Sequence, residues 1–250
     1  MFIVLRKKTI LTAIAVILLV AVSLSVVIGL GAREAKTERK LPVYAVESGQ
    51  NAVALTFDAS WGAERTSLIM DVLEKYEVKG TFFLTGIWID AYPDKVKEIA
   101  ARGHEIQNHS LNHLNMSKLS VTEQIKEIET VNQKIEALTG KKPLYFRPPF
   151  GDYDNTLIAT VRSLGMQSVQ WDIDSLDWKK LSGGQIADRV SKARDGSVIL
   201  CHNNSEHIVE ALPLILEGLK NKKLKPVTVS ELIAVDNYNI DSSGLQLRSK

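Results

Sequence analysis

The sequence is poor in the features that define several common classes of protein. Its single cysteine, Cys201, excludes any disulfide within the chain. Charge of one sign is not in excess, because 31 Lys and Arg stand against 29 Asp and Glu. No basic stripe interleaved with aromatic residues is present, which argues against a nucleic-acid partner. Internal repeats and low-complexity segments are also missing, so neither a repeat protein nor a biased-composition chain is indicated.

One long apolar run is present near the start of the chain. Residues 9–32 form 24 consecutive residues without a charge, and three basic residues, 6–8, precede them. A membrane-spanning helix needs ~20 apolar residues, and positive charges mark its cytoplasmic side. We therefore expect a cytoplasmic N-terminus (1–8), a single-pass signal-anchor (9–32) and an extracytoplasmic remainder. The alternative is a cleaved signal peptide followed by secretion, for which Gly29 and Gly31 offer a small-residue cleavage pattern.

The rest of the chain is long enough for one domain. With 45% apolar residues in 250, it can bury one substantial core. Residues 33–50 are charged and aperiodic, which predicts a linker. Residues 51–235 form the predicted domain, and the polar residues 236–250 are expected to be a loose tail.

Apolar periodicity predicts alternating strands and helices in this domain. Strands are expected at 52–57, 81–86, 104–109, 144–147, 166–171, 197–202 and 226–229. Helices are expected at 67–76, 94–102, 120–140, 154–164, 184–194 and 207–221. Seven strands alternating with helices predict an α/β fold with a parallel sheet, either open or closed into a barrel.

Polar clusters follow five of the predicted strands. They read TFDASW, NHSLNH, RPPFGDY, WDIDSLDW and LCHNN. In α/β barrels the loops after the strands converge at one end and carry the active site. The five clusters together therefore predict one site, although each has a plainer explanation when taken alone.

The clusters contain residues suited to metal binding and acid–base chemistry. Asp58 at a strand end suits a metal ligand or a general base. His109 and His113 are four residues apart and would share a face if the stretch were helical, as a zinc ligand pair does; two surface histidines in a loop are the alternative. His202 is interpreted as a general acid, with a structural histidine as the alternative. Strand alternation places its neighbour Cys201 on the opposite face, so the two are not expected to form a nucleophile–base pair.

Two further clusters suggest positioning groups. Arg147 begins a rigid double-proline loop, where its guanidinium suits bidentate binding of a carboxylate and the backbone N–H of Phe150 suits an oxyanion. The alternative is a rigid turn with a surface arginine. In WDIDSLDW, an acid suits the orientation of a histidine, the tryptophans suit packing against a sugar ring or a methyl group, and helix capping by an acid is the alternative.

Taken in order, TFDxS, HSxxH, RPPFG, DSxDW and LxH, followed by KPVTVSELI, resemble the motifs of the polysaccharide deacetylases. These are the NodB-homology domains of carbohydrate esterase family four, and the resemblance covers about residues 50–235. The TFDxSWG variant, with the apolar N-terminal run, resembles the PdaB-like, sporulation-associated branch. The resemblance implies a distorted (β/α)7 barrel that removes N-acetyl groups from cell-wall glycan with a divalent metal, usually zinc.

The resemblance also implies a role for each matching residue. His109 and His113 match the metal ligands, Asp58 the general base and His202 the general acid. Arg147 matches the residue that orients the base, and Asp177 the residue that orients the acid. The backbone N–H of Phe150 would face the oxyanion, while Trp178 and Leu200 would line a pocket for the acetyl methyl group.

Ala59 departs from the family pattern. The family has a metal-binding aspartate at this position, and an alanine methyl group cannot coordinate a metal. The sequence therefore leaves two functions open. One is a membrane-anchored deacetylase of peptidoglycan with an altered metal shell, completed by Asp58, Ser60 or water; the other is a catalytically impaired glycan-binding protein. The expected partners are cell-wall glycan and a membrane, with oligomeric state left open.

Overall fold

The computed structural model describes residues 12, 14–21, 39–234 and 236–248. The chain divides into two compact units, Met1–Arg39 and Lys40–Lys250. Most of the predicted anchor (9–32) lies outside the described residues, as do residues 1–8; of the anchor, residues 14–21 are helical. In the described residues, no helix combines the length and apolar character that crossing a bilayer requires.

The larger unit is built on a parallel sheet. Its strands are β2 (Ala52–Ala59), β3 (Thr81–Leu84), β4 (Glu105–Asn108), β5 (Tyr145–Phe146), β6 (Gln167–Ser168), β7 (Ile173–Asp174), β8 (Val198–His202) and β9 (Lys225–Val227). Their order is β6-β5-β4-β3-β2-β8-β7, with β9 paired to the start of β2. In the described part of the chain β6 and β7 do not pair, so the predicted α/β barrel is an open half-barrel.

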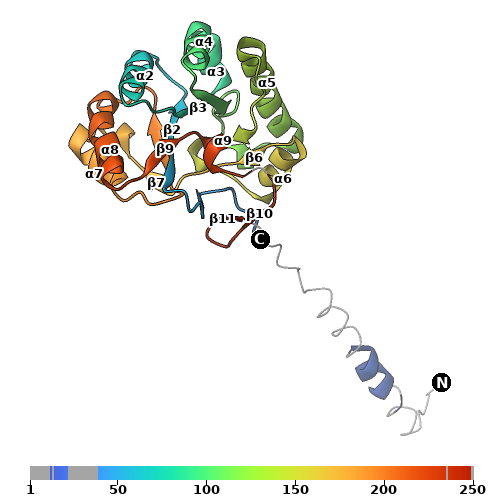
Figure 1. Cartoon of the computed structure of the whole chain (residues 1–250). Coiled ribbons are helices and arrows are strands. Elements are labelled where there is room, and N and C mark those ends of the chain that lie inside the picture. Colours follow the sequence, from blue (N-terminus) through green and yellow to red (C-terminus); the bar gives the residue numbers. More distant parts are fainter. Residues whose placement is uncertain (1–11, 13, 22–38, 235, 249–250) are drawn as a thin grey trace, which may run out of the picture. The chain divides into compact units, whose positions relative to one another are not determined.

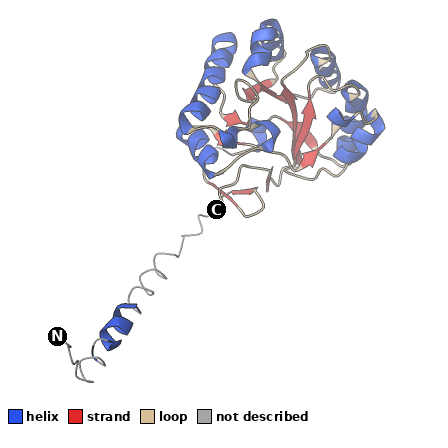
Figure 2. Cartoon of the chain, turned by 180° about the vertical axis from the view of Figure 1, so that it is seen from behind, coloured by secondary structure: helices blue, strands red, loops and turns tan. Residues whose placement is uncertain are grey.

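Helices pack along the outside of this curved sheet (Figures 1 and 2). They are α2 (Thr66–Lys75), α3 (Gly86–Ala91), α4 (Pro93–Ala101), α5 (Val121–Thr139), α6 (Asn155–Ser163), α7 (Gly183–Val190), α8 (Ile208–Asn221) and α9 (Val229–Leu232), with short 3₁₀ turns η1 (Met116–Lys118), η2 (Pro149–Gly151) and η3 (Asp177–Lys179). The capping box predicted for the longest helix is present, because Ser120 and Glu123 each bond the other's backbone.

Strand β2 lies at the centre of the sheet, and its sequence explains why. All of its residues are buried, as expected for a strand covered on both faces. Phe57 and Ala59 belong to the main apolar cluster, which includes Ile69 and Leu73 of α2 and Leu212 of α8. A second apolar cluster includes Ala54, from the alternate positions of β2. This packing holds the polar end of β2 rigidly at the carboxyl edge of the sheet.

The two segments expected to be irregular contain strands. A separate sheet is formed by three strands, β1 (Ala45–Val46), β10 (Tyr238–Ile240) and β11 (Leu245–Arg248), in the order β1-β11-β10. The expected linker therefore joins the domain at its C-terminal half, and the expected tail is structured up to residue 248. The physical reason is the side chain of Gln246, which is fully buried and bonds both backbone groups of Ala234.

Candidate active site

Asp58 and Arg147 form a buried ion pair at the end of β2. The Arg147 side chain is fully buried and donates from Nη1 to Asp58 Oδ1 at 2.7 Å and to Thr56 Oγ1 at 2.8 Å. Its Nη2 donates to the Gln170 carbonyl oxygen at 3.2 Å. The guanidinium also lies 4.1 Å from the centre of the Phe83 ring. Arg147 thus holds one carboxylate oxygen of Asp58 and leaves the other, Oδ2, for the pocket.

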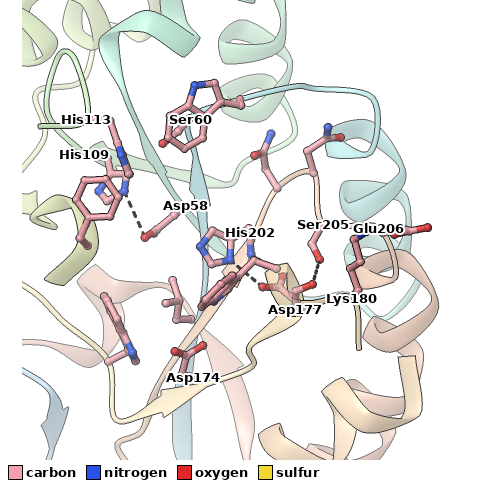
Figure 3. A pocket seen from close by; sticks show the side chains of 17 residues that line it. Asp58, Ser60, His109, His113, Asp174, Asp177, Lys180, His202, Ser205 and Glu206 are labelled. Atoms are coloured by element: carbon pink, nitrogen blue, oxygen red, sulfur yellow. Dashed lines mark hydrogen bonds and ion pairs between the residues drawn. The ribbon is translucent and has the colours of Figure 1, made fainter. Parts of the chain in front are cut away.

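The two predicted metal histidines lie beside this carboxylate, but not on a helix. His109 Nδ1 lies 2.7 Å from the Arg147 carbonyl oxygen, and its Nε2 lies 3.5 Å from Asp58 Oδ2. Ser110 and His113 have left-handed backbone angles, φ 69° and 56°, which turn the loop back on itself. The two imidazole rings are 5.1 Å apart. A tight turn, and not the helical face considered from the sequence, brings them together (Figure 3).

His202 and Asp177 form the second polar pair of the site. Asp177 Oδ1 lies 2.7 Å from His202 Nδ1, and Asp177 Oδ2 accepts the backbone N–H of His202 at 2.8 Å. The Asp177 side chain is fully buried, and Ser205 Oγ donates to its backbone carbonyl. Because Nδ1 contacts the carboxylate, Nε2 is the ring nitrogen of His202 that is left for a substrate. The His202 side chain is 33% exposed.

Apolar side chains complete the pocket. Its volume is about 750 Å³, and its lining includes Asp58, both histidines of the HSLNH loop, Asp177 and His202 together with Phe150, Trp178 and Leu200. Phe150 and Trp178 are exposed, at 65% and 58%, whereas Leu200 is buried at 3%. Arg147 lies beneath the pocket and supports it through Asp58. Eight of the nine residues selected from the sequence therefore line one pocket, and the ninth, Arg147, contacts Asp58. Figure 3 labels five of them, Asp58, His109, His113, Asp177 and His202.

The two pairs have opposite electrostatic settings. Burial by itself raises the pKa of Asp58, but the charge of Arg147, the charge of His202 and the hydrogen bond from Arg147 outweigh it and lower that pKa below its ordinary value. Burial by itself lowers the pKa of His202, but the hydrogen bond and charge of Asp177 outweigh it and raise that pKa above its ordinary value. Asp58 is therefore held as a carboxylate, and His202 favours its imidazolium form.

The histidine pair is electrostatically suited to a metal. Burial lowers the pKa of His109, and burial is the largest cause that lowers the pKa of His113 to about 4. Both rings are thus neutral, as metal ligands must be. The bond from His109 Nδ1 to a backbone carbonyl leaves Nε2 with its lone pair, the arrangement found in metal-ligating histidines. His113 Nδ1 is buried and has no partner in the described part of the chain.

A third protein ligand is not in place. Among the described residues, no group of three His, Cys, Asp or Glu has the arrangement of a metal site. Ala59 is fully buried, belongs to the apolar cluster against the helices and does not line the pocket, whereas Ser60 does. The residues therefore fit a divalent metal as a two-imidazole pair, with Asp58 Oδ2 3.5 Å from His109 Nε2.

The structure adds residues that the sequence did not single out. Trp61 is 65% exposed and packs edge-on against the His113 ring, 4.8 Å between centroids. Asn203 donates its backbone N–H to the Asp58 carbonyl and its amide to Gly62 O and Thr66 Oγ1. Both residues belong to polar clusters named above, TFDASW and LCHNN. The sequence therefore indicated that they lie near the site, but it could not predict their contacts.

Comparison with known proteins agrees with this site. The model of the family described as polysaccharide deacetylase matches residues 45–169. The chain is 35% identical over 188 residues to the peptidoglycan-N-acetylmuramic acid deacetylase PdaC of Bacillus subtilis, covering 75% of this chain and 40% of PdaC. It is 36% identical over 185 residues to a peptidoglycan-N-acetylglucosamine deacetylase of Bacillus cereus, covering 72% of this chain and 67% of that protein.

A solved structure is also similar. The family-four pseudoenzyme of Bacillus anthracis superposes with a TM-score of 0.74 at 32% identity, covering 78% of this chain and 69% of that one. The chain spans less than half the length of PdaC. Fold, site and sequence agree, and the chain belongs to the polysaccharide deacetylase family of carbohydrate esterase family four.

Proposed function

We propose that this protein is a hydrolase that removes N-acetyl groups from peptidoglycan. The observation that carries the proposal is the pair of opposed acid–base groups in one pocket, Asp58 held by Arg147 and His202 held by Asp177. The names of the relatives support the substrate class, because PdaC and the Bacillus cereus enzyme are both peptidoglycan deacetylases. They differ in the sugar, so peptidoglycan and not one of its two sugars is proposed.

The chain's own residues account for the proton transfers of amide hydrolysis. Asp58, as a carboxylate, takes a proton from the water that attacks the acetyl carbon. His202, as an imidazolium, gives a proton from Nε2 to the amide nitrogen as the C–N bond breaks. The products are acetate and a free amine on the sugar. Asp177 keeps His202 in the correct orientation, as the third member of a catalytic triad does.

Other pocket residues place the acetyl group. Leu200 and Trp178 form an apolar wall on which the acetyl methyl group packs. Phe150 lines the pocket and has a left-handed backbone, with φ 58°; in this proposal its backbone N–H binds the carbonyl oxygen. A divalent metal bound by His109 and His113 would polarise the carbonyl and the water, and zinc is the metal proposed.

A second function is favoured by one observation. Ala59 leaves the metal pair without the family's carboxylate, and a relative of the same fold is a pseudoenzyme. In that case the chain binds glycan in the same pocket without hydrolysing it. A mutant of that pseudoenzyme has restored enzymatic activity, so in that protein sequence changes are enough to recover activity.

The remaining parts of the proposal concern the cellular setting. Residues 9–32 would anchor the chain in the cell membrane with the domain outside, with secretion after signal cleavage as the alternative. The branch resembled by TFDASWG suggests a role in sporulation. Fractionating cells that produce the tagged full chain tests the membrane anchor. Following the amount of the protein through spore formation tests the role in sporulation.

The decisive experiment is acetate release from purified peptidoglycan by the full chain, with added zinc and with a chelator. Zinc-dependent acetate is expected. The same assay with His202→Ala should lose about 100- to 10,000-fold in rate, the usual share of a general acid. Zinc binding by that variant should be unchanged. Release of no acetate by a folded chain that still binds peptidoglycan would support the glycan-binding alternative.

A further inference from the structure

The turn that carries His113 has an unusual backbone. Ser110 and His113 both have left-handed φ angles, and neither is a glycine. Residues with a side chain rarely adopt such angles, and they keep them only where surrounding contacts hold them. One contact lies within the turn, where Ser110 Oγ accepts the backbone N–H of His113 at 3.1 Å. Further contacts come from helix α5, which packs behind the turn.

Helix α5 binds this turn through the carboxylate of Glu127. Oε2 of Glu127 accepts the backbone N–H of Asn112 at 2.8 Å, and Oε1 accepts the side-chain N–H of Asn112 at 2.6 Å. Asn112 directly precedes His113 in the chain. Hydrogen bonds to a carboxylate are about twice as strong as those between neutral groups, and a bidentate pair also fixes direction. Both oxygens of Glu127 therefore hold the residue next to His113.

Burial of the Glu127 carboxylate supports a role beyond packing. The residue is 6% exposed, and the hydrogen bonds that the structure gives its side chain come from neutral groups of Asn112. Burying a carboxylate is costly, and an apolar side chain would fill the same space at lower cost. Glu127 and Asn112 do not line the active-site pocket. The buried carboxylate is therefore explained by the turn that it holds, and it acts on the site from behind.

A separate contact holds the other end of the turn. Asn108, the last residue of β4, is fully buried and donates from Nδ2 to two oxygen atoms of α5, each at 2.8 Å. Its Oδ1 accepts the backbone N–H of Ser110 at 2.8 Å. His109 lies between these two residues and is fixed by contacts that do not involve Glu127. The bonds from Glu127 thus act at the end of the turn next to His113.

We infer that Glu127, acting through Asn112, is a positioning residue for the proposed metal pair. It keeps the His113 ring beside that of His109, 5.1 Å between centroids, so that both imidazoles can bind one divalent cation. The inference rests on the metal-dependent form of the proposed function. It extends the metal site from its two imidazoles to the helix behind them.

Glu127→Gln tests this contact, because it keeps the size and replaces one accepting oxygen with an NH2 group that faces a donor of Asn112. Calorimetric titration of the full chain with zinc should show an affinity lower by about 10–100-fold, the usual cost of losing an outer partner of a metal ligand. Glu129→Gln is the matched control, since it makes the same change of charge at an exposed position of α5. Its zinc affinity should equal that of the wild type.

Asn112→Ala breaks the side-chain half of the same contact. Residue 112 is exposed, so this variant tests the inference even if Glu127→Gln does not fold. It should weaken zinc binding by about two- to tenfold, the share of one hydrogen bond. The double variant should bind zinc no more weakly than Glu127→Gln alone, because both changes break one contact.

Hydrogen exchange follows the turn without metal. Amide exchange across residues 109–113 of the full chain should be at least about tenfold faster in Glu127→Gln, the effect of losing about 1.4 kcal/mol of hydrogen bonding. The Glu129→Gln control should exchange like the wild type. Faster exchange together with weaker zinc binding links the conformation of the turn to the metal pair.

Four results would overturn the inference. They are unchanged zinc affinity in Glu127→Gln and Asn112→Ala, an equal fall in Glu129→Gln, a double variant whose effects add, and a wild-type chain that binds no zinc. The first, with faster exchange, would mean that Glu127 only stabilises the loop. The last would leave glycan binding by the pocket open. A chain that binds zinc as expected but releases no acetate would contradict the proposed function and leave this inference standing.

Discussion

Asp58 and Asp177 are carboxylates of one pocket with different partners. Asp58 faces a guanidinium, which holds it ionised, and Asp177 faces an imidazole, which it holds protonated. Neighbouring charge decides the form of each group, because both pairs are buried enough for charges to act strongly. The proposed division of labour between base and acid therefore rests on Arg147 and Asp177 as much as on the reacting groups.

The first prediction at this scale concerns pH. His202 must be protonated to act as an acid, so activity is present below its raised pKa and is lost as pH rises through it. In Asp177→Asn the supporting charge is gone while the burial that lowers the pKa remains. The alkaline limb of the rate profile should move to lower pH, measured as acetate release across a pH series.

Asp174→Asn is the control for this experiment. Asp174 lines the same pocket, but the contact to His202 Nδ1 comes from Asp177, and the charge of Asp174 raises this pKa less than that of Asp177 does. The alkaline limb of the Asp174→Asn rate profile should move less than that of Asp177→Asn. Equal movement in the two variants would show that the general charge of the pocket, and not the Asp177 contact, sets the limb.

The second prediction concerns Ala59. In Ala59→Asp a carboxylate enters a fully buried position, where an unpaired charge destabilises the fold. Without zinc the melting temperature should fall. The family has its metal-binding aspartate at this position, so with zinc the melting temperature should recover and zinc affinity should rise by at least about tenfold, since even outer partners of a metal are worth ~10–100-fold. This result requires the end of β2 to turn the new carboxylate away from the apolar cluster and toward the histidine pair. Calorimetric titration and thermal unfolding measure both. Ala59→Leu, which cannot bind metal, should show no recovery.

At the scale of elements, the site depends on loops from distant strands. The loops after β2 and β8 are joined by Asn203, which is 2% exposed and bonds Gly62, Thr66 and, through its backbone, Asp58. Since β8 also carries His202, this one residue sets the proposed acid and base at a fixed separation. It acts as a positioning residue and lies outside the reacting set.

Asn203→Ala should therefore affect both stability and rate. Removing the amide leaves Gly62 O and Thr66 Oγ1 without this donor, which should lower the free energy of unfolding by about 1–3 kcal/mol. Urea unfolding measures that loss, and acetate release should fall in the folded variant. Asn204→Ala is the matched control at a less buried neighbour, for which the loss should be smaller.

At the scale of the whole molecule, the two ends of the folded unit close on each other. β1 pairs with β11 in parallel, and β10 pairs with β11 in the antiparallel sense. Gln246 ties this small sheet to Ala234. The C-terminal segment is thus part of the fold, on the side of the unit away from the active pocket.

Ending the chain after residue 234 should therefore destabilise it. The truncation exposes apolar residues that β10 and β11 cover, and we expect a loss of at least about 2 kcal/mol, or a fall of about 4–8 °C in melting temperature. Circular dichroism of the full and shortened chains measures this. An unchanged melting temperature would show that residues 236–250 do not stabilise the fold, as expected for the loose tail that the sequence predicts.

The α/β class and the order of elements could be predicted because they depend on local patterns. Apolar spacing, the Ser120 capping box and the position of polar clusters after strands are all read within a few residues. The open edge of the sheet between β6 and β7 could not be predicted, since closure depends on strand curvature over the whole sheet. The left-handed turn at Ser110 and His113 was equally hidden, because neither residue is a glycine.

By itself, then, the sequence determined which chemical groups the site contains and that they share one edge of a parallel sheet. Tertiary structure alone decided their working arrangement: the nitrogen of His109 that faces Asp58, the burial of Ala59 in the apolar cluster, and the Asn203 link between loops. The reason is physical. Residue type and strand-end position are local properties, whereas hydrogen-bond partners and burial arise only when segments distant in the sequence pack together, as those of Asn203 and Gly62, 141 residues apart, do.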